Sequence, residues 1–217
     1  MPRNKYPEET REKILDAALR TFQEKGYEES TILDIVANMD GLTRGAFYHH
    51  FKSKEEVFTI ICERIFENNN PFVKAATEKN LTGMEKLRKA LKINMATQQS
   101  DFELVNSAAD ELYKSPLFFK WLVEFNASVS HKYIEPIIKE GIADGSIKNQ
   151  DPRLLAELFT VMFSFWISPI MFQGDEEYLE KKSRAVFTIL DDFGLTLYDE
   201  EVGELGLTWI EENKAKE

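Results

Sequence analysis

The segment from residue 42 to residue 54 holds the side chains best suited to binding an anion. It contains one arginine, two lysines and two histidines, and it has no acidic residue. These basic side chains are Arg44, His49, His50, Lys52 and Lys54. Guanidinium and ammonium groups bind phosphate, and a guanidinium can also bond the edge of a guanine base. The segment is therefore a candidate surface for touching an anion such as a nucleic acid.

Two short helices joined by a tight turn would position this segment. Ser30 or Thr31 can cap the first helix, and Asp34 is spaced to form a capping box with Thr31. Asp40-Gly41 predicts the turn, because glycine readily adopts a positive φ angle. Thr43 can cap the second helix. Apolar side chains would anchor both helices inward: Ile32, Ile35, Val36, Met39, Phe47 and Phe51.

This pattern is a helix-turn-helix, whose second helix fits the major groove of DNA. Arg44 can bond guanine or a phosphate, and Tyr48 and His49 can reach phosphates or thymine methyl groups. The hydroxyl of Thr31, at the start of the first helix, and the ammonium group of Lys54 can contact phosphates. The expected DNA contacts are Thr31, Thr43, Arg44, Gly45, Tyr48, His49 and Lys54.

The rest of the chain is also predicted to be helical. Residues 10–25 form an amphipathic helix that Gly26 can end, and a capping box at Ser53–Glu56 opens another helix. Further helices are expected at 82–99, 101–114, 115–143, 151–172, 174–198 and 200–210. No convincing strand pattern is present. The fold class is therefore all-α, with a small domain at residues 1–54 and a larger domain at residues 55–217.

Two C-terminal helices have so many apolar residues that more than one side of each must be buried against other helices. Of the 19 residues from Leu154 to Phe172, 15 are apolar, and the last long helix adds a broad apolar face. A second copy of the chain could cover both helices in a four-helix interface across a two-fold axis. The alternative is complete burial inside a monomer core. We predict a homodimer formed through the last two long helices.

The net charge of −11 comes entirely from residues 55–217. Residues 1–54 hold 9 Lys/Arg and 9 Asp/Glu, whereas residues 55–217 hold 18 and 29. Such an acidic chain is unsuited to coating nucleic acid in general, but it leaves one local basic patch. The single cysteine, Cys62, fits a reducing compartment. No apolar run reaches the roughly 20 residues that cross a bilayer. We expect a cytoplasmic protein without membrane contact.

Aromatic and polar side chains in the larger domain could line a small-molecule pocket. The candidate ligand-binding residues are Asn94, Gln98, Phe102, Asn106, Asp110 and Phe163. Unpaired polar groups near apolar helix faces would be costly, so they could serve to orient a ligand. The aromatic residues could equally form a packed core. The abundant carboxylates, Asp110 among them, favour a neutral or cationic ligand over an anionic one.

From about residue 10 to residue 65 the chain resembles the TetR family of bacterial transcriptional regulators. The block TRGAFYHHFKSKEE, from Thr43 to Glu56, is nearly the whole family signature. Further matching stretches are Ile14–Ala18, Phe22, Gly26–Tyr27, Ser30–Thr31 and Asp34–Val36. The resemblance implies a homodimer whose N-terminal domain binds a near-palindromic double-stranded DNA operator. It also implies that the C-terminal domain binds a small-molecule effector that releases the DNA, and it implies the seven DNA contacts named above.

The spacing between Asp34 and Thr43 is one residue longer than is usual in that family. Either the turn is longer, or the helix before it extends by one residue. In both cases the second helix would tilt differently, and individual base contacts would change with it.

Other classes of function find little support in the sequence. There is no phosphate-binding glycine loop, nucleophile elbow or zinc-protease motif, so we expect no enzyme activity and no cofactor. His49 and His50 would point about 100° apart on a helix, which is unsuited to a shared metal ion. The alternative to a DNA-binding regulator is a helical interaction module that keeps the fold but recruits another protein.

Overall fold

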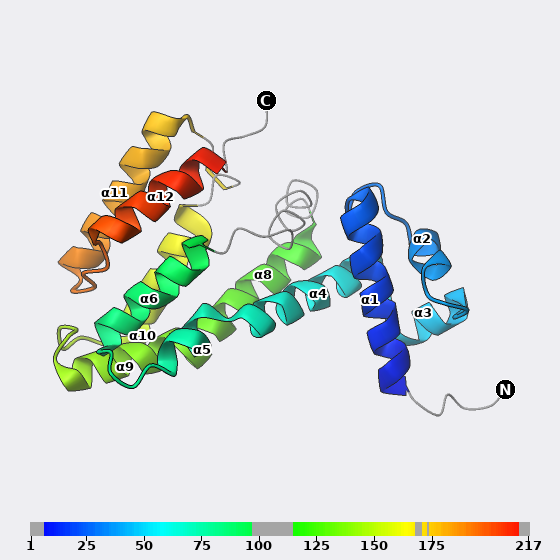
Figure 1. The fold of residues 1–217 in the computed structure, drawn as a ribbon, viewed down its shortest axis with the longest axis horizontal. Helices are drawn as coiled ribbons and strands as arrows, with labels where there is room; N and C mark the ends of the chain where they lie inside the picture. Colours follow the sequence, from blue (N-terminus) through cyan, green and yellow to red (C-terminus); the bar gives the residue numbers. More distant parts are fainter. Residues whose placement is uncertain (1–6, 97–114, 168–170, 173, 213–217) are drawn as a thin grey trace. The chain divides into compact units, whose positions relative to one another are not determined.

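The computed structural model describes residues 7–96, 115–167, 171–172 and 174–212. Every regular element in these ranges is a helix (Figure 1), which confirms the all-α fold class. No helix within the same ranges is long and apolar enough to cross a lipid bilayer. The helix expected at 101–114 lies outside the described residues.

The chain's described helices are numbered in sequence order. They are α1 (Pro7–Lys25), α2 (Ile32–Ala37), α3 (Arg44–His50), α4 (Lys54–Asn69), α5 (Pro71–Ala76), α6 (Gly83–Ala96), α8 (Pro116–Val129), α9 (Glu135–Asp144), α10 (Pro152–Thr160), α11 (Glu176–Asp192) and α12 (Glu200–Glu212). Two π-helical segments accompany them: η1 (Ser130–Ile134) joins α8 to α9, and η2 (Val161–Trp166) extends α10.

Contacts divide the chain into two compact units. The described residues of the N-terminal unit are 7–69 and 115–121. The C-terminal unit takes residue 70 onward and, after the return of the chain, residue 122 onward. Helix α8 therefore contributes its first turns to the N-terminal unit and its remaining turns to the C-terminal unit.

One apolar core holds the N-terminal unit together. Helix α1 packs against α2, α3 and α4, and Phe118 at the start of α8 belongs to the same core. Four phenylalanine side chains in it are almost completely buried: Phe22, Phe47, Phe51 and Phe58. Each such burial contributes roughly 1.5–3 kcal/mol. The aromatic core therefore fixes α3, the second helix of the helix-turn-helix, against α1.

The helix ends use the capping chemistry that the sequence predicts. Thr31 and Asp34 form a reciprocal capping box at the start of α2, and the Thr43 hydroxyl accepts the Ala46 N–H at the start of α3. Gly26 has a φ of 79° just after α1, as expected for a helix stop. These local hydrogen bonds fix where α2 and α3 begin.

Helix α5 was not predicted, and two of the predicted C-terminal helices end earlier or change geometry. Helix α11 ends at Asp192 rather than near residue 198, because Gly194 has a φ of 86° and its N–H closes a turn on the Asp191 carbonyl. The helix expected to run to residue 172 changes from α to π geometry at Val161, and its described part ends at Trp166.

The turn between α2 and α3 spans residues 38–43. Helix α2 ends at Ala37 and α3 begins at Arg44. Between them Asp40 has a φ of 43° and Gly41 a φ of 83°. Among the residues that the structure describes, Asp40 is the only non-glycine residue with a positive φ. Two successive left-handed residues reverse the chain within the turn. Whether the additional residue lengthens the turn or the helix before it, relative to the family, stays a prediction.

Replacing Gly41 by alanine should lower the free energy of unfolding by about 1 kcal/mol, because an L side chain is strained at its φ of 83°. An added Cβ would meet nothing within 4 Å, so the effect is conformational. Urea unfolding measures it. The control is Gly45→Ala in α3, where the new Cβ lies an ordinary 3.6 Å from the Thr43 Oγ1. Equal stability of both variants would contradict the left-handed turn.

The C-terminal unit is built around α6, which packs against α5, α9 and α12. A series of aromatic rings crosses the unit, with neighbouring centroids between 4.8 and 6.1 Å apart. The rings in order are Phe72, Phe159, Phe163, Phe187 and Tyr198. Offset and edge-to-face ring pairs of this kind stabilise a core beyond simple burial. The series links α5 with α10, η2 and α11.

Candidate nucleic-acid interface

Helix α3 divides its side chains sharply between the core and the solvent. Phe47 is completely buried, which anchors the helix. The residues on its other side are exposed: Thr43, Arg44, Gly45, Tyr48 and His49. We call these five residues the α3 face. All five are predicted DNA contacts, so the structure brings five of the seven predicted residues together on one exposed surface.

The α3 face combines a fixed cation with an aromatic platform. The Arg44 guanidinium lies over the Tyr48 ring, 5.4 Å from its centroid, and Tyr48 keeps 45% of its surface exposed. Stacking of this kind orients a guanidinium while leaving its N–H groups outward. Burial lowers the pKa of the adjacent His50, so this imidazole carries little charge at neutral pH. Arg44 is therefore the main positive charge on the helix.

Thr31 is exposed at the start of α2, but its hydroxyl is already engaged. The hydroxyl donates to the Asp34 carboxylate at 2.6 Å, and it accepts the Asp34 N–H. The Asp34 carboxylate also accepts hydrogen bonds from the Lys25 ammonium and the Thr31 N–H. The bond from Lys25 and those from Thr31 lower the pKa of Asp34 to about 2. Thr31 therefore holds the start of α2 in place, whatever it contacts in addition.

Lys54 lies at a junction of backbone carbonyls rather than in open solvent. Its ammonium donates to the carbonyls of Tyr27, Glu28 and Ser30 at 2.7, 3.2 and 3.0 Å. It also lies 4.1 Å from the centroid of the Tyr27 ring. These contacts tie the start of α4 to the loop between α1 and α2. The geometry supports a positioning role for Lys54, and its phosphate contact stays a prediction.

Replacing Lys54 by glutamine should reduce the free energy of unfolding by about 2 kcal/mol, since several partly buried carbonyls lose a charged donor. Thermal unfolding measures the loss. The matched control is Lys52→Gln, which removes the same charge from an exposed side chain. A positioning role also predicts weaker DNA binding at every salt concentration. If Lys54 bound a phosphate instead, the free energy of unfolding would not change. The slope of the logarithm of the DNA-binding constant against the logarithm of the salt concentration would then decrease in magnitude by about 1.

The predicted ligand-binding residues are only partly covered by the structure. Gln98, Phe102, Asn106 and Asp110 lie outside the described residues. Asn94 is exposed on α6. Phe163 is half-buried in the aromatic series between Phe159 and Phe187. The described part of the chain therefore does not bring Asn94 and Phe163 into one recognisable site.

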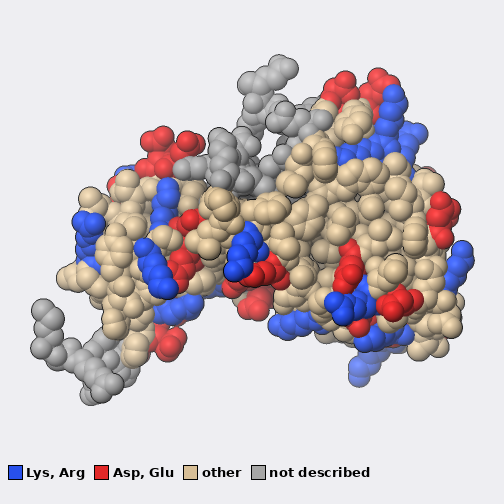
Figure 2. Space-filling view, turned by 180° about the vertical axis from the view of Figure 1, so that it is seen from behind, with Lys and Arg blue, Asp and Glu red and all other residues tan. Residues whose placement is uncertain are grey.

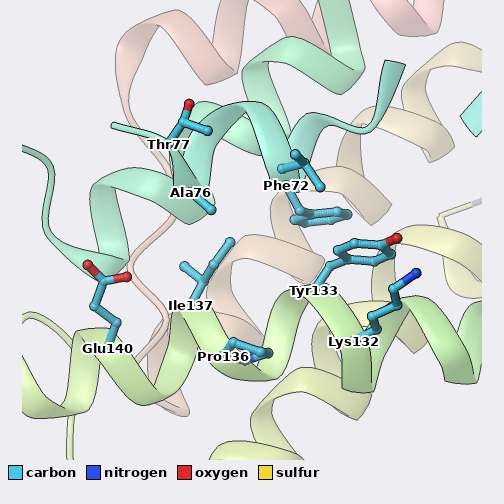
Figure 3. A pocket seen from close by; sticks show the side chains of 9 residues that line it. Phe72, Ala76, Thr77, Lys132, Tyr133, Pro136, Ile137 and Glu140 are labelled. Atoms are coloured by element: carbon cyan, nitrogen blue, oxygen red, sulfur yellow. The ribbon is translucent and has the colours of Figure 1, made fainter. Parts of the chain in front are cut away.

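A groove of about 310 Å³ lies in the C-terminal unit between α5 and the stretch formed by η1 and α9 (Figure 3). We call it the α5–α9 groove. Its lining residues are Phe72, Val73, Ala76, Thr77, Lys132, Tyr133, Pro136, Ile137 and Glu140. The sequence reasoning missed this site because its two walls are about 60 residues apart in the chain. The one local signal was Pro136, which interrupts an otherwise regular helix.

Charges on the face that Figure 2 draws are mixed. On the face that Figure 2 draws, acidic side chains lie scattered among basic ones and are not gathered into one patch. Within the described residues no group of three or more His, Cys, Asp or Glu side chains is arranged to hold a metal ion. Burial raises the pKa of the Cys62 thiol to about 12, so this thiol is unreactive at neutral pH.

Comparison with known proteins agrees with the helix-turn-helix. Residues 14–59 match the family model described as bacterial regulatory proteins, tetR family. The HTH-type transcriptional repressor KstR2 of Mycolicibacterium smegmatis is 30% identical over 148 residues, which span 65% of this chain and 69% of KstR2. The uncharacterized HTH-type transcriptional regulator YhgD of Bacillus subtilis is 26% identical over 174 residues, 79% of this chain and 88% of YhgD.

A solved structure shows that the similarity extends over the whole fold. A TetR-family transcriptional regulator from Pectobacterium atrosepticum matches 97% of this chain and 93% of its own, with a TM-score of 0.60 and 21% identity. The helix-turn-helix and the surrounding helices define a DNA-binding transcriptional regulator. The chain belongs to the TetR family.

Proposed function

We propose that this protein is a dimeric repressor that binds a near-palindromic operator through α3 and is released from it by a small molecule. The observation that carries the proposal is the α3 face, where five predicted contacts are exposed while Phe47 anchors the helix in the core. An exposed helix of this kind can enter the major groove and present Arg44 to base edges. The similarity to KstR2, a repressor by name, supports repression over activation.

The apolar surface of the C-terminal helices supports dimerisation. Leu154, Val161 and Phe193 each expose more than 40% of their surface, and every described side chain from Met162 to Trp166 is only half-buried. Burial of such side chains against a second copy of the chain lowers the free energy and so stabilises a dimer. We propose a homodimer through α10, η2 and α11. Binding to successive major grooves of an operator requires its two α3 helices to lie about 34–36 Å apart, one turn of DNA. In this proposal residues 1–54 bind DNA, and residues 55–217 bind the effector and dimerise.

A gel-shift experiment with the DNA upstream of the protein's own gene tests the operator proposal. We expect a specific complex that persists against excess unrelated DNA and weakens steeply as salt rises. The alternative is a module that recruits another protein. Its specific support is the additional residue between Asp34 and Thr43. A protein that shifts no DNA and instead binds a protein partner independently of salt would establish that alternative.

A further inference from the structure

A polar contact crosses the apolar core between α1 and the helix-turn-helix. Thr21 on α1 is completely buried, and its hydroxyl donates to the Ala17 carbonyl at 2.8 Å. The same oxygen accepts the side-chain amide N–H of Asn38 at 3.0 Å. A hydrogen bond needs both a short distance and an aligned donor. The contact therefore stabilises one placement of Asn38 relative to α1.

This one residue of α1 lies next to both ends of α2, which Figure 1 draws beside α1. At the far end, its partner Asn38 is the C-cap residue of α2. Before α2, the buried hydroxyl of Ser30 lies 3.3 Å from the Thr21 carbonyl and 2.5 Å from the Gly26 carbonyl. The position of α2 is therefore set by polar contacts with α1 at both ends.

Asn38 is also the first residue of the turn that leads to α3. Its carbonyl accepts a hydrogen bond from the Arg20 guanidinium at 3.1 Å, so its backbone and its side chain are both bonded to α1. The next residue, Met39, is buried in the core. Apolar burial has no preferred direction, whereas a hydrogen bond weakens steeply when it is misaligned. The contacts of Asn38 therefore fix the direction in which the chain leaves α2.

That direction affects how α3 is presented to DNA. Helix α3 begins after the turn and is anchored along one side by Phe47. A helix held on one side can still tilt about its anchor. A bond between Arg44 and a base edge depends on the angle at which α3 enters the groove. Attraction to the phosphate backbone is independent of base sequence. A tilt of α3 would therefore change base recognition more than general affinity for DNA.

We propose that Thr21 and Asn38 are positioning residues, which set the direction of α3 through their mutual hydrogen bond and thereby the base preference of DNA binding. Neither residue is among the seven predicted DNA contacts. Thr21 is completely buried, so it acts through other residues and not on DNA itself. The inference rests on the proposed function, because it requires α3 to bind DNA.

The specificity ratio tests this role. It is the Kd for unrelated DNA divided by the Kd for the operator fragment, measured at a temperature at which circular dichroism shows every variant folded. Thr21→Val removes the hydroxyl and keeps nearly the same side-chain shape. We expect the ratio to fall about tenfold, the size of one impaired base contact. The Kd for unrelated DNA should change less than about twofold, because the phosphate contacts remain.

Two further variants separate the hydrogen bond from packing. Thr21→Ser keeps the hydroxyl and removes a buried methyl group, so it should melt at a lower temperature but keep the wild-type specificity ratio. Thr160→Val in α10 is the matched control, since it removes another buried hydroxyl that donates to the carbonyl four residues earlier. It should leave the ratio unchanged. A wild-type ratio in Thr21→Val, or a decrease that Thr21→Ser shares, would overturn the positioning role.

A double-mutant cycle tests whether the two residues act through their mutual bond. Asn38→Ala removes the amide at a half-buried position and leaves the Thr21 hydroxyl bonded to the Ala17 carbonyl. The fold should therefore persist even if Thr21→Val does not fold. We expect the ratio to fall about tenfold in Asn38→Ala and no further in the double variant. Additive losses, about a hundredfold in the double variant, would overturn the shared bond as the cause.

Failure of this inference and failure of the proposed function give different results. If the wild type binds the operator specifically and both Thr21→Val and Asn38→Ala keep its specificity ratio, the positioning role is overturned and the proposed function stands. If the folded wild type binds no DNA, the proposed function is overturned and the inference with it.

Discussion

Replacing Arg44 and Tyr48 together by alanine should weaken specific operator binding by about a hundredfold, because each good base contact is worth about 1–3 kcal/mol. Both side chains are exposed on the α3 face and contact each other across 5.4 Å. Neither is part of the apolar core, so urea unfolding should change little. Gel-shift titration against the selected operator measures the loss in affinity.

The control for this double variant is Lys79→Ala in the turn after α5. It removes one positive charge from an exposed side chain, so it reproduces any effect of net charge alone. Operator affinity of the control should match that of the wild type. If the double variant binds the operator as tightly as the control does, α3 is not part of the DNA interface.

The single variants separate the roles of the two residues. If Arg44 bonds a guanine, Arg44→Ala relaxes the preference at one base pair and leaves binding to unrelated DNA nearly unchanged. If Arg44 bonds a phosphate, all sequences weaken alike and the salt slope falls by about 1. Tyr48→Phe keeps the ring under the guanidinium and removes the hydroxyl. It therefore distinguishes a stacking role from a direct bond to DNA.

The sequence predicts those features of the fold that depend on short-range chemistry. The Thr31–Asp34 capping box joins residues three positions apart, and Gly26 and Gly145 take their positive φ angles immediately after helix ends. The 3.6-residue periodicity places Phe47 inward and leaves Arg44 outward. These rules involve only near neighbours, so the sequence contains all the information they need.

Features that depend on tertiary packing were not predictable in the same way. Lys54 follows a serine that opens a helix, which suggests an exposed cation, yet its ammonium meets carbonyls 24 to 27 residues earlier in the chain. The α5–α9 groove joins segments that only the folded chain brings together.

The close crossing of α6 and α9 leads to the largest expected loss of stability. A Cβ added at Gly83 would lie 2.2 Å from the Gly141 backbone nitrogen and 2.6 Å from the Ile137 carbonyl oxygen. Backbone atoms on both sides cannot move aside as a flexible side chain can. The Gly83 N–H also donates to the Asp144 carboxylate at 2.8 Å. Gly83→Ala should therefore lower the free energy of unfolding by about 3 kcal/mol, the cost of overpacking a tight contact.

Thermal unfolding of Gly83→Ala measures this loss, with Gly206→Ala as the control. The added Cβ at Gly206, in α12, meets nothing within 4 Å, so alanine there should raise stability by about 0.5–1 kcal/mol. An unchanged melting temperature for Gly83→Ala would mean that α6 and α9 cross at a greater distance. Because Ile137 both faces Gly83 and lines the α5–α9 groove, the same substitution should displace α9 and change the shape of the groove in the molecules that remain folded.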